Sequence, residues 1–128
     1  MHVELVSPER ILYSGEAEMV ICRTVDGGDV AFLADHAPFL GALEIWTVTV
    51  RTTQGDDVLA AVHGGFVHVR DNEVILLSDV AELAGDIDRE RARRAQERAE
   101  RNEAKMDDAE AEAALRRARV RLEAAENN

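Results

Sequence analysis

Four arginines in the last third of the chain have the type and spacing to hold an anion. Arg91 and Arg98 are seven residues apart and Arg117 and Arg121 are four apart, so each pair lies on one face of a helix. A guanidinium group offers forked N–H donors that suit phosphate oxygens. Two helices that face each other can therefore present a polyphosphate site. The same spacing is also typical of a solvated surface laced with salt bridges, and spacing alone favours that interpretation.

Other residues that often carry chemistry form no convincing site. His36 is isolated, and His63 and His68 are an odd number of residues apart across a Gly-Gly break, so a metal site is not predicted. Residues 26–29 lack the Lys and Ser/Thr of a P-loop and precede a strand, which favours a turn. Cys22 lies in an apolar strand without a histidine partner. We expect neither a metal site nor catalytic residues.

The arginines must be positioned by residues 86–128, whose composition predicts two helices. Gly and Pro are absent there, and Ala, Glu and Arg dominate. Asn102 to Asp108 is the expected turn, with Asp107 able to cap the second helix. Small and apolar residues recur at steps of three and four, which predicts one narrow packing stripe on each helix. The stripes are Ala92, Ala95, Ala99 and Asn102, then Ala111, Leu115, Ala118, Leu122 and Ala125.

These stripes predict a weak helical hairpin. A buried methylene contributes only about 0.8 kcal/mol, whereas ordering a residue costs roughly 1 to 2 kcal/mol of backbone entropy. We infer that the hairpin is conditional, and that a ligand or docking against the rest of the chain holds it folded. As one straight helix, this segment would reach roughly 60 Å at about 1.5 Å per residue.

Residues 1–85 read as eight or nine short strands separated by turn signals, which predicts an all-β sandwich or barrel. Gly15 is expected to end one strand and start another. Gly64 and Gly65 interrupt a strand pattern, which predicts a bulge or a close backbone approach. Asp71 and Asn72 fit a tight hairpin turn.

Charge and length restrict the function. The 128 residues carry a formal net charge of -11, and nucleic-acid binding needs a basic surface instead. The chain has room for a β domain at 1–85 and a two-helix domain at 86–128.

The lone Cys22 indicates a reducing compartment. No apolar run of about 18 residues is present, so we expect a soluble chain that meets a membrane only through a partner.

Two segments, residues 28–40 and 61–66, resemble signatures of the epsilon subunit of F-type ATP synthases. The resemblance of the chain to this family runs essentially end to end. Residues 28–40 resemble the family's signature of a Gly, a short apolar strand, and His-x-Pro followed by apolar residues. Ala31 and Ala34 depart from it, since Gly and Pro are usual there. Residues 61–66 resemble a second signature closely. The resemblance implies a β-sandwich N-terminal domain followed by an α-helical hairpin.

A third segment, residues 87–92, resembles the ATP-binding motif Ile/Leu-Asp-x-x-Arg-Ala of some bacterial epsilon subunits at every fixed position. The resemblance also matches an acidic residue before the motif, a basic residue one helix face further, and two arginines of the second helix. It implies regulatory ATP rather than a permanent cofactor. The implied ATP-binding residues are Glu82, Ile87, Asp88, Arg91, Ala92, Arg98, Arg117 and Arg121.

The family resemblance further implies a non-catalytic rotor subunit that couples rotation to ATP synthesis. The β domain is expected to dock on the gamma subunit and, through Asp29 and the loop of His36, on the ring of c subunits. The helical domain is expected to switch to an extended form that enters the alpha/beta catalytic head and blocks ATP hydrolysis. The implied location is peripheral, at the cytoplasmic face of the cell membrane.

A competing hypothesis is a free-standing nucleotide sensor or adaptor whose hairpin binds some other partner. It uses the same helical arginines but needs no large complex. Purification of the native protein separates the two hypotheses, because only a rotor subunit accompanies a membrane ATPase.

Overall fold

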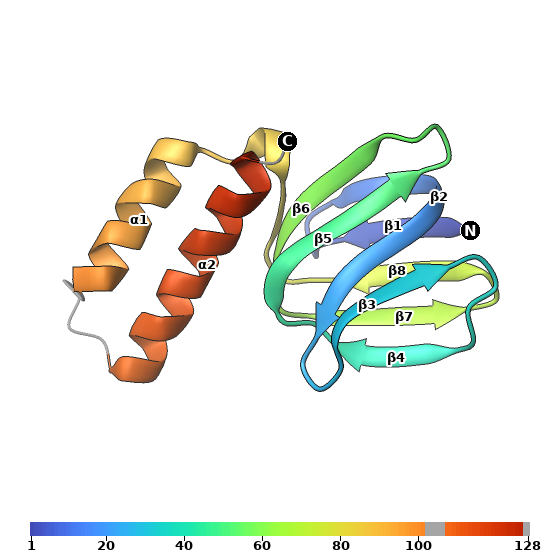
Figure 1. The fold of residues 1–128 in the computed structure, drawn as a ribbon, viewed down its shortest axis with the longest axis horizontal. Helices are drawn as coiled ribbons and strands as arrows, with labels where there is room; N and C mark the ends of the chain where they lie inside the picture. Colours follow the sequence, from blue (N-terminus) through green and yellow to red (C-terminus); the bar gives the residue numbers. More distant parts are fainter. Residues whose placement is uncertain (102–106, 127–128) are drawn as a thin grey trace.

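A computed structural model describes residues 1–101 and 107–126. It shows a β-sandwich beside a pair of antiparallel helices (Figure 1). The strands are β1 (His2–Val6), β2 (Ile11–Thr24), β3 (Gly28–Leu33), β4 (Phe39–Ala42), β5 (Ile45–Thr52), β6 (Asp57–His63), β7 (Phe66–Arg70), β8 (Glu73–Leu77) and β9 (Ala81–Leu83). The helices are a 3-10 turn at Ala84–Asp86, α1 (Arg89–Arg101) and α2 (Asp108–Glu126). The predicted sandwich followed by a helical hairpin is confirmed.

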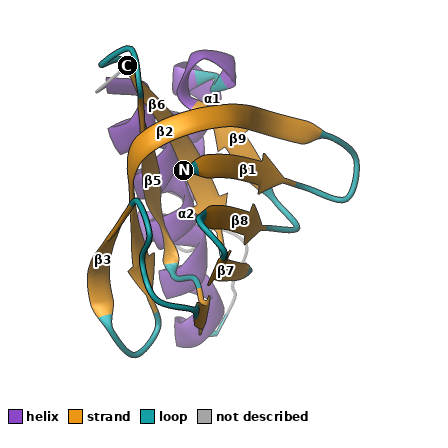
Figure 2. Cartoon of the chain, turned by 90° about the vertical axis from the view of Figure 1, so that its right-hand side faces the viewer, coloured by secondary structure: helices purple, strands orange, loops and turns teal. Residues whose placement is uncertain are grey.

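Strand β2 belongs to both layers of the sandwich. Its first half pairs with β1, which continues to β8, β7 and β4, while its second half pairs with β3 and β5, and β5 continues to β6 and β9. Figure 2 shows this long strand curving across the molecule. The prediction that a strand ends at Gly15 was wrong, because Gly15 stays in the ladder opposite Val3.

Two strands were not predicted from the sequence. Strand β4 pairs with β7, and β9 is a three-residue strand that pairs with β6. Both are short edge strands, so neither carries enough alternating residues to give a period-two pattern. Strand β9 holds Glu82 on the side of the sheet that faces the helices.

Alternation along the strands fills the space between the two layers. Val48 and Val50 of β5, and Ala60 and Val62 of β6, are buried as the strand pattern predicts. Ala61 is also buried, although it points to the opposite face of β6. Both faces of this strand are therefore covered, one by the second sheet and the other by the helices.

Two predicted turns explain where the chain reverses. Asp71 and Asn72 both have positive φ, 51° and 60°, as a tight hairpin with the handedness of the sheet requires. Gly65 has φ 117°, and a Cβ atom there would overlap the carbonyl oxygen of Leu77. The predicted close backbone approach at the Gly-Gly pair is thus confirmed.

Helix α2 lies between α1 and the sheet (Figure 1). As predicted, Asp107 caps it, since the Asp107 Oδ1 atom accepts a hydrogen bond from the Glu110 amide at 2.8 Å. Of the expected turn Asn102 to Asp108, residues 102–106 lie outside the described part of the chain. Asp108 is the first residue of α2 rather than a turn residue.

The packing of α2 differs from the predicted single stripe. Ala118 and Ala125 are buried as expected, but Val120 and Ala124 are buried as well, in a cluster with Ala61 of β6. The reason is that α2 has two neighbours and therefore two buried faces. The sandwich supplies the docking surface that the weak stripes require.

Candidate functional site: a cavity lined by arginines beneath the helical hairpin

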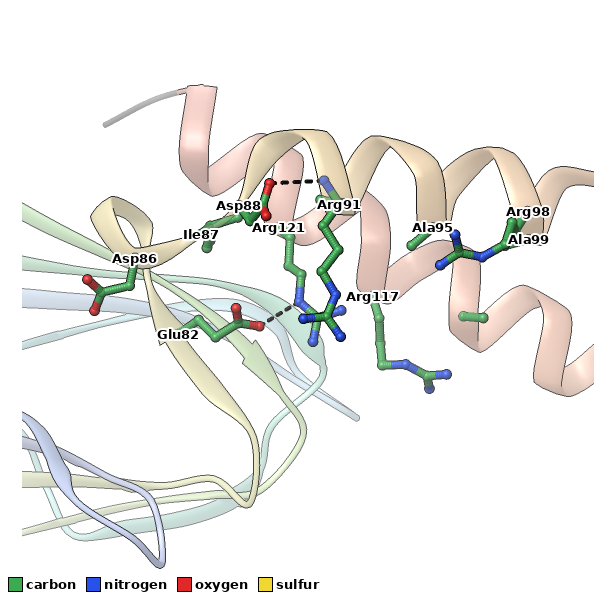
Figure 3. Close-up of a pocket in the computed structure, with 12 residues that line it drawn as sticks. Glu82, Asp86, Ile87, Asp88, Arg91, Ala95, Arg98, Ala99, Arg117 and Arg121 are labelled. Carbon is green, nitrogen blue, oxygen red and sulfur yellow. Dashed lines mark hydrogen bonds and ion pairs between the residues drawn. The ribbon is translucent and has the colours of Figure 1, made fainter.

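The site begins at the cap of α1. The Asp88 Oδ1 atom accepts a hydrogen bond from the Arg91 amide at 3.1 Å, so Asp88 satisfies an otherwise unpaired donor of the first turn. Its negative charge also lies at the positive end of the helix dipole. The cap fixes where the helix starts, and Arg91 consequently lies in the first turn beside the sheet (Figure 3).

A cavity of about 530 Å³ lies between α1, α2 and β9. Its size falls in the range of roughly 300–1,000 Å³ that is usual for small-molecule sites. All eight residues that the sequence assigned to ATP line this one cavity: Glu82, Ile87, Asp88, Arg91, Ala92, Arg98, Arg117 and Arg121. The expectation that a hairpin brings the two arginine pairs together is confirmed (Figure 3).

Positive charge dominates the cavity. The Arg121 Nε atom donates to Glu82 Oε1 at 2.5 Å, which ties α2 to the sheet. Asp86 pairs with Arg10 at 3.5 Å. Within the described ranges 1–101 and 107–126, no ion pair is found for the side chains of Arg91, Arg98 and Arg117. Three guanidinium groups thus remain available to an anion.

Small side chains keep the cavity open. Ala92, Ala95 and Ala99 of α1, and Ala114 of α2, form its apolar wall. A larger residue at any of these positions would project into the space between the helices. The family resemblance assigned Ala92 to the ATP site, whereas Ala95 and Ala99 were assigned to packing alone. Ala114 and Asp86 were not predicted to line the cavity.

His63 lies behind Glu82 and was missed as a candidate for this region. Its side chain is only 3% exposed, and its Nε2 atom is 3.7 Å from Glu82 Oε1. Neither ring nitrogen has a hydrogen-bond partner. Burial and the charge of Arg121 lower the pKa of His63 to about 4, so the imidazole is neutral.

Further contacts hold the helices on the sandwich. Arg116 of α2 pairs with Glu44 at 3.1 Å, and Arg89 donates a hydrogen bond to the carbonyl oxygen of Ala125 near the end of α2. The second contact places a cation at the negative end of a helix dipole. In contrast, α1 buries only Ala92 and Ala99.

Asp29 and His36, the expected ring contacts, lie at opposite ends of β3, Asp29 as its second residue and His36 three residues after its end. Asp29 near its start pairs with Arg23 at 2.9 Å, and this hydrogen bond lowers the pKa of Asp29. His36 follows its end and packs edge-on against Phe32, with ring centroids 4.9 Å apart. The structure does not bring these two residues together.

The described residues include no group of three or more His, Cys, Asp or Glu side chains that could hold a metal ion. Neither α1 nor α2, over the ranges that the structure describes, is long and apolar enough to cross a membrane.

Comparisons with known proteins agree with this architecture. Residues 1–84 match the family described as ATP synthase, Delta/Epsilon chain, beta-sandwich domain. An ATP synthase epsilon chain of Streptomyces griseus is 50% identical over 124 residues, which cover 97% of this chain and 94% of the relative. The chain belongs to the ATP synthase epsilon chain family. Another member of the family, from Streptomyces avermitilis, is 49% identical over the same shares of the two chains.

Solved structures of ATP synthases share the fold of this family member. A chain of the mitochondrial ATP synthase of Euglena gracilis superposes with a TM-score of 0.71 at 23% identity, covering 97% of this chain and 76% of that chain. A chain from the central stalk and c-ring structure of the Tetrahymena thermophila mitochondrial enzyme gives a TM-score of 0.57 at 18% identity, with 67% and 68% covered. At these identities the similarity concerns the fold.

Proposed function

We propose that this chain is a non-catalytic rotor subunit in the central stalk of an F-type, proton-translocating ATP synthase. It couples rotation to ATP synthesis, and its helical hairpin restrains ATP hydrolysis under the control of bound ATP. Membership of the epsilon family supports the assembly. The cavity supports the nucleotide, because three of its arginines have no ion pair within the described residues, and this observation carries the regulatory part.

The outer face of β4, β7 and β8 is the proposed contact for the gamma subunit. Leu40, Phe66 and Leu77 are 71%, 56% and 49% exposed there, and Phe66 pairs directly with Leu77 across the sheet. Apolar side chains gathered on one sheet face are typical of a protein–protein interface. A large subunit that covers this face would remove these three side chains from water.

The proposed contact for the c-subunit ring runs along β3, which is an edge strand paired only with β2 within the described sheets. Asp29, Ala31 and Leu33 are exposed along it, and the loop of His36 follows. A contact along the whole strand would include both Asp29 and the loop of His36, although these two residues lie at opposite ends of β3. Through it the chain is peripheral at the cytoplasmic face of the membrane.

ATP is proposed to occupy the cavity and to stabilise the compact hairpin. Its phosphates would meet Arg91, Arg98 and Arg117, which come from both helices, so one ligand bridges them. Without ATP, the mutual repulsion of these cations and the thin alanine packing favour release of the helices. The released segment would extend towards the alpha/beta catalytic head and block hydrolysis.

Calorimetric titration of ATP into the isolated chain tests the nucleotide proposal. The wild type should release heat with a single site, and Arg91→Ala should weaken binding about 10- to 150-fold, as expected for loss of a charge-assisted hydrogen bond of roughly 1.5–3 kcal/mol. Arg93→Ala is the matched control, because Arg93 lies in the same turn but pairs with Glu90 outside the cavity.

Absence of heat at millimolar ATP would end the nucleotide proposal and leave the family assignment intact. Purification of the native protein tests the assembly separately. Recovery without a large membrane ATPase would favour the free-standing sensor or adaptor instead.

A further inference from the structure

One buried polar side chain beside the cavity has no hydrogen-bond partner. His63 ends β6, opposite Ile45 of β5, and its side chain is 3% exposed. Neither ring nitrogen has a hydrogen-bond partner among the residues that the structure describes. An unpaired buried polar group is costly to keep, so its position requires an explanation.

The surroundings of His63 join the sheet to α2. Glu82 of β9 directs one oxygen, Oε1, towards two groups, since it accepts from Arg121 Nε at 2.5 Å and lies 3.7 Å from His63 Nε2. The charged groups that act on His63 are this carboxylate and two cations of α2, Arg117 and Arg121. When the imidazole is neutral, Arg121 is the cation that pairs with Glu82.

A proton on His63 changes this balance. The imidazolium would compete for the same carboxylate oxygen and would repel both arginines of α2 in a poorly solvated space. When α2 detaches, Arg117 and Arg121 move away from the imidazolium, while Glu82 stays beside it as a neighbour of opposite charge. The protonated side chain therefore suits the detached state, and the neutral side chain suits the compact state.

We propose that His63 is a proton-sensitive release point, through which acidification detaches α2 from the sheet by drawing Glu82 away from Arg121. The inference rests on the proposed release of the hairpin. It adds a second control beside ATP: the nucleotide holds the two helices from the cavity side, and the proton acts from the sheet side.

Linkage gives the sign and size of the effect. The pKa of His63 is lowered to about 4 in the compact state, chiefly by burial and then by Arg121, and its ordinary value is 6.5. The compact state is thus favoured above pH 6.5, and this advantage is lost as the pH falls from 6.5 towards 4. The opening constant of α2 should rise about 20-fold between pH 7 and pH 5.

Hydrogen exchange of the α2 amides, corrected for the intrinsic pH dependence of exchange, measures this opening constant in the full chain. Nuclear magnetic resonance titration of the His63 ring follows its protonation in the same samples. His63→Phe keeps a ring of similar size but takes up no proton, and His63→Asn is a second non-titrating variant in case Phe does not fit. His68→Phe is the control, because His68 lies exposed on the outer face of β7.

The wild type and His68→Phe should show the rise, and both His63 variants should lose it. An equal rise in the His63 variants would overturn the inference, because a group other than His63 would then be responsible. A flat wild-type profile would overturn it as well. Exchange of the α2 amides with and without ATP at pH 8 separates the two proposals. If ATP does not slow this exchange but acidification still speeds it, only the nucleotide proposal fails. If ATP slows it but acidification has no effect, only the His63 proposal fails.

Discussion

Asp88 has a structural role that explains its place in the site. Its carboxylate caps α1 through the Arg91 amide and thereby sets the position of an arginine that lines the cavity. The same side chain therefore bears on helix stability and on the proposed anion binding. The two effects can be separated, since an amide caps a helix as well as a carboxylate does.

Asp88→Ala should destabilise α1 by about 0.5–2 kcal/mol, because one helix donor loses its acceptor. Faster hydrogen exchange in the first turn of α1 is the measurement. Asp88→Asn is the matched control and should keep most of the protection. Equal loss of protection in both variants would show that charge, and not the cap, governs this end of the helix.

At this scale the sequence predicted eight of the residues that line the cavity, and it missed Asp86, Ala114 and the role of His63 beside it. Arg91, Arg98, Arg117 and Arg121 were predictable because helical spacing and a short motif place them on facing sides. His63 could not be predicted, since its neighbours come from β9 and α2, and strand β9 itself was not recognised. Only the fold brings a histidine, a carboxylate and an arginine from three elements together.

Helix α2 is the element on which the compact form depends. It buries Val120 and Ala124 against the sheet, forms the pairs Arg116–Glu44 and Arg121–Glu82, and carries α1 on its other side. Helix α1 buries only two alanines. Opening of the interface between α2 and the sheet should therefore free both helices.

Val120→Ala tests this dependence. Removing two buried methyl-sized groups should weaken docking of α2 by about 1.5–3 kcal/mol, which speeds exchange of its amides roughly 10- to 150-fold. The strands of the sandwich should exchange at the wild-type rate. Val25→Ala is the control, because Val25 is 52% exposed. Equal acceleration in helix and strands would contradict independent release of α2.

Periodicity predicted the helices well but not their packing. A three- and four-residue step identifies one apolar face, and α2 has two because it lies between a helix and a sheet. In β2, the glycine signal was misleading for a related reason. Gly15 resembles a strand end in sequence, whereas in the structure the chain passes there from one layer to the other.

At the scale of the whole molecule, the sandwich and the helices form separate modules. We propose a division into a sandwich, residues 1–85, and a helical domain, residues 86–128. The sandwich has its own core between its two layers, centred on side chains such as Phe32, Leu5 and Leu76. That core does not include the helices.

Deletion of residues 87–128 should leave a folded sandwich with a cooperative unfolding transition in urea. In the assembled enzyme it should relieve inhibition of ATP hydrolysis without loss of rotor assembly. The deletion exposes Ala61 and its neighbours, so replacing the half-buried Ile45 with Thr in the truncated chain should improve its solubility. An unfolded truncated chain would contradict the two-module division.

Strand β2 gives the sandwich a mechanical property. Its 14 residues run through both layers, so one continuous backbone segment joins them, in addition to hydrogen bonds such as that from the Val25 amide to the Ala42 carbonyl oxygen. Its first half bears the layer whose outer face is proposed to meet the gamma subunit, and its second half bears β3, the proposed ring edge. Torque that passes between these two partners would load a covalent chain in tension. Such a part would stay stiff during the proposed release of the helices.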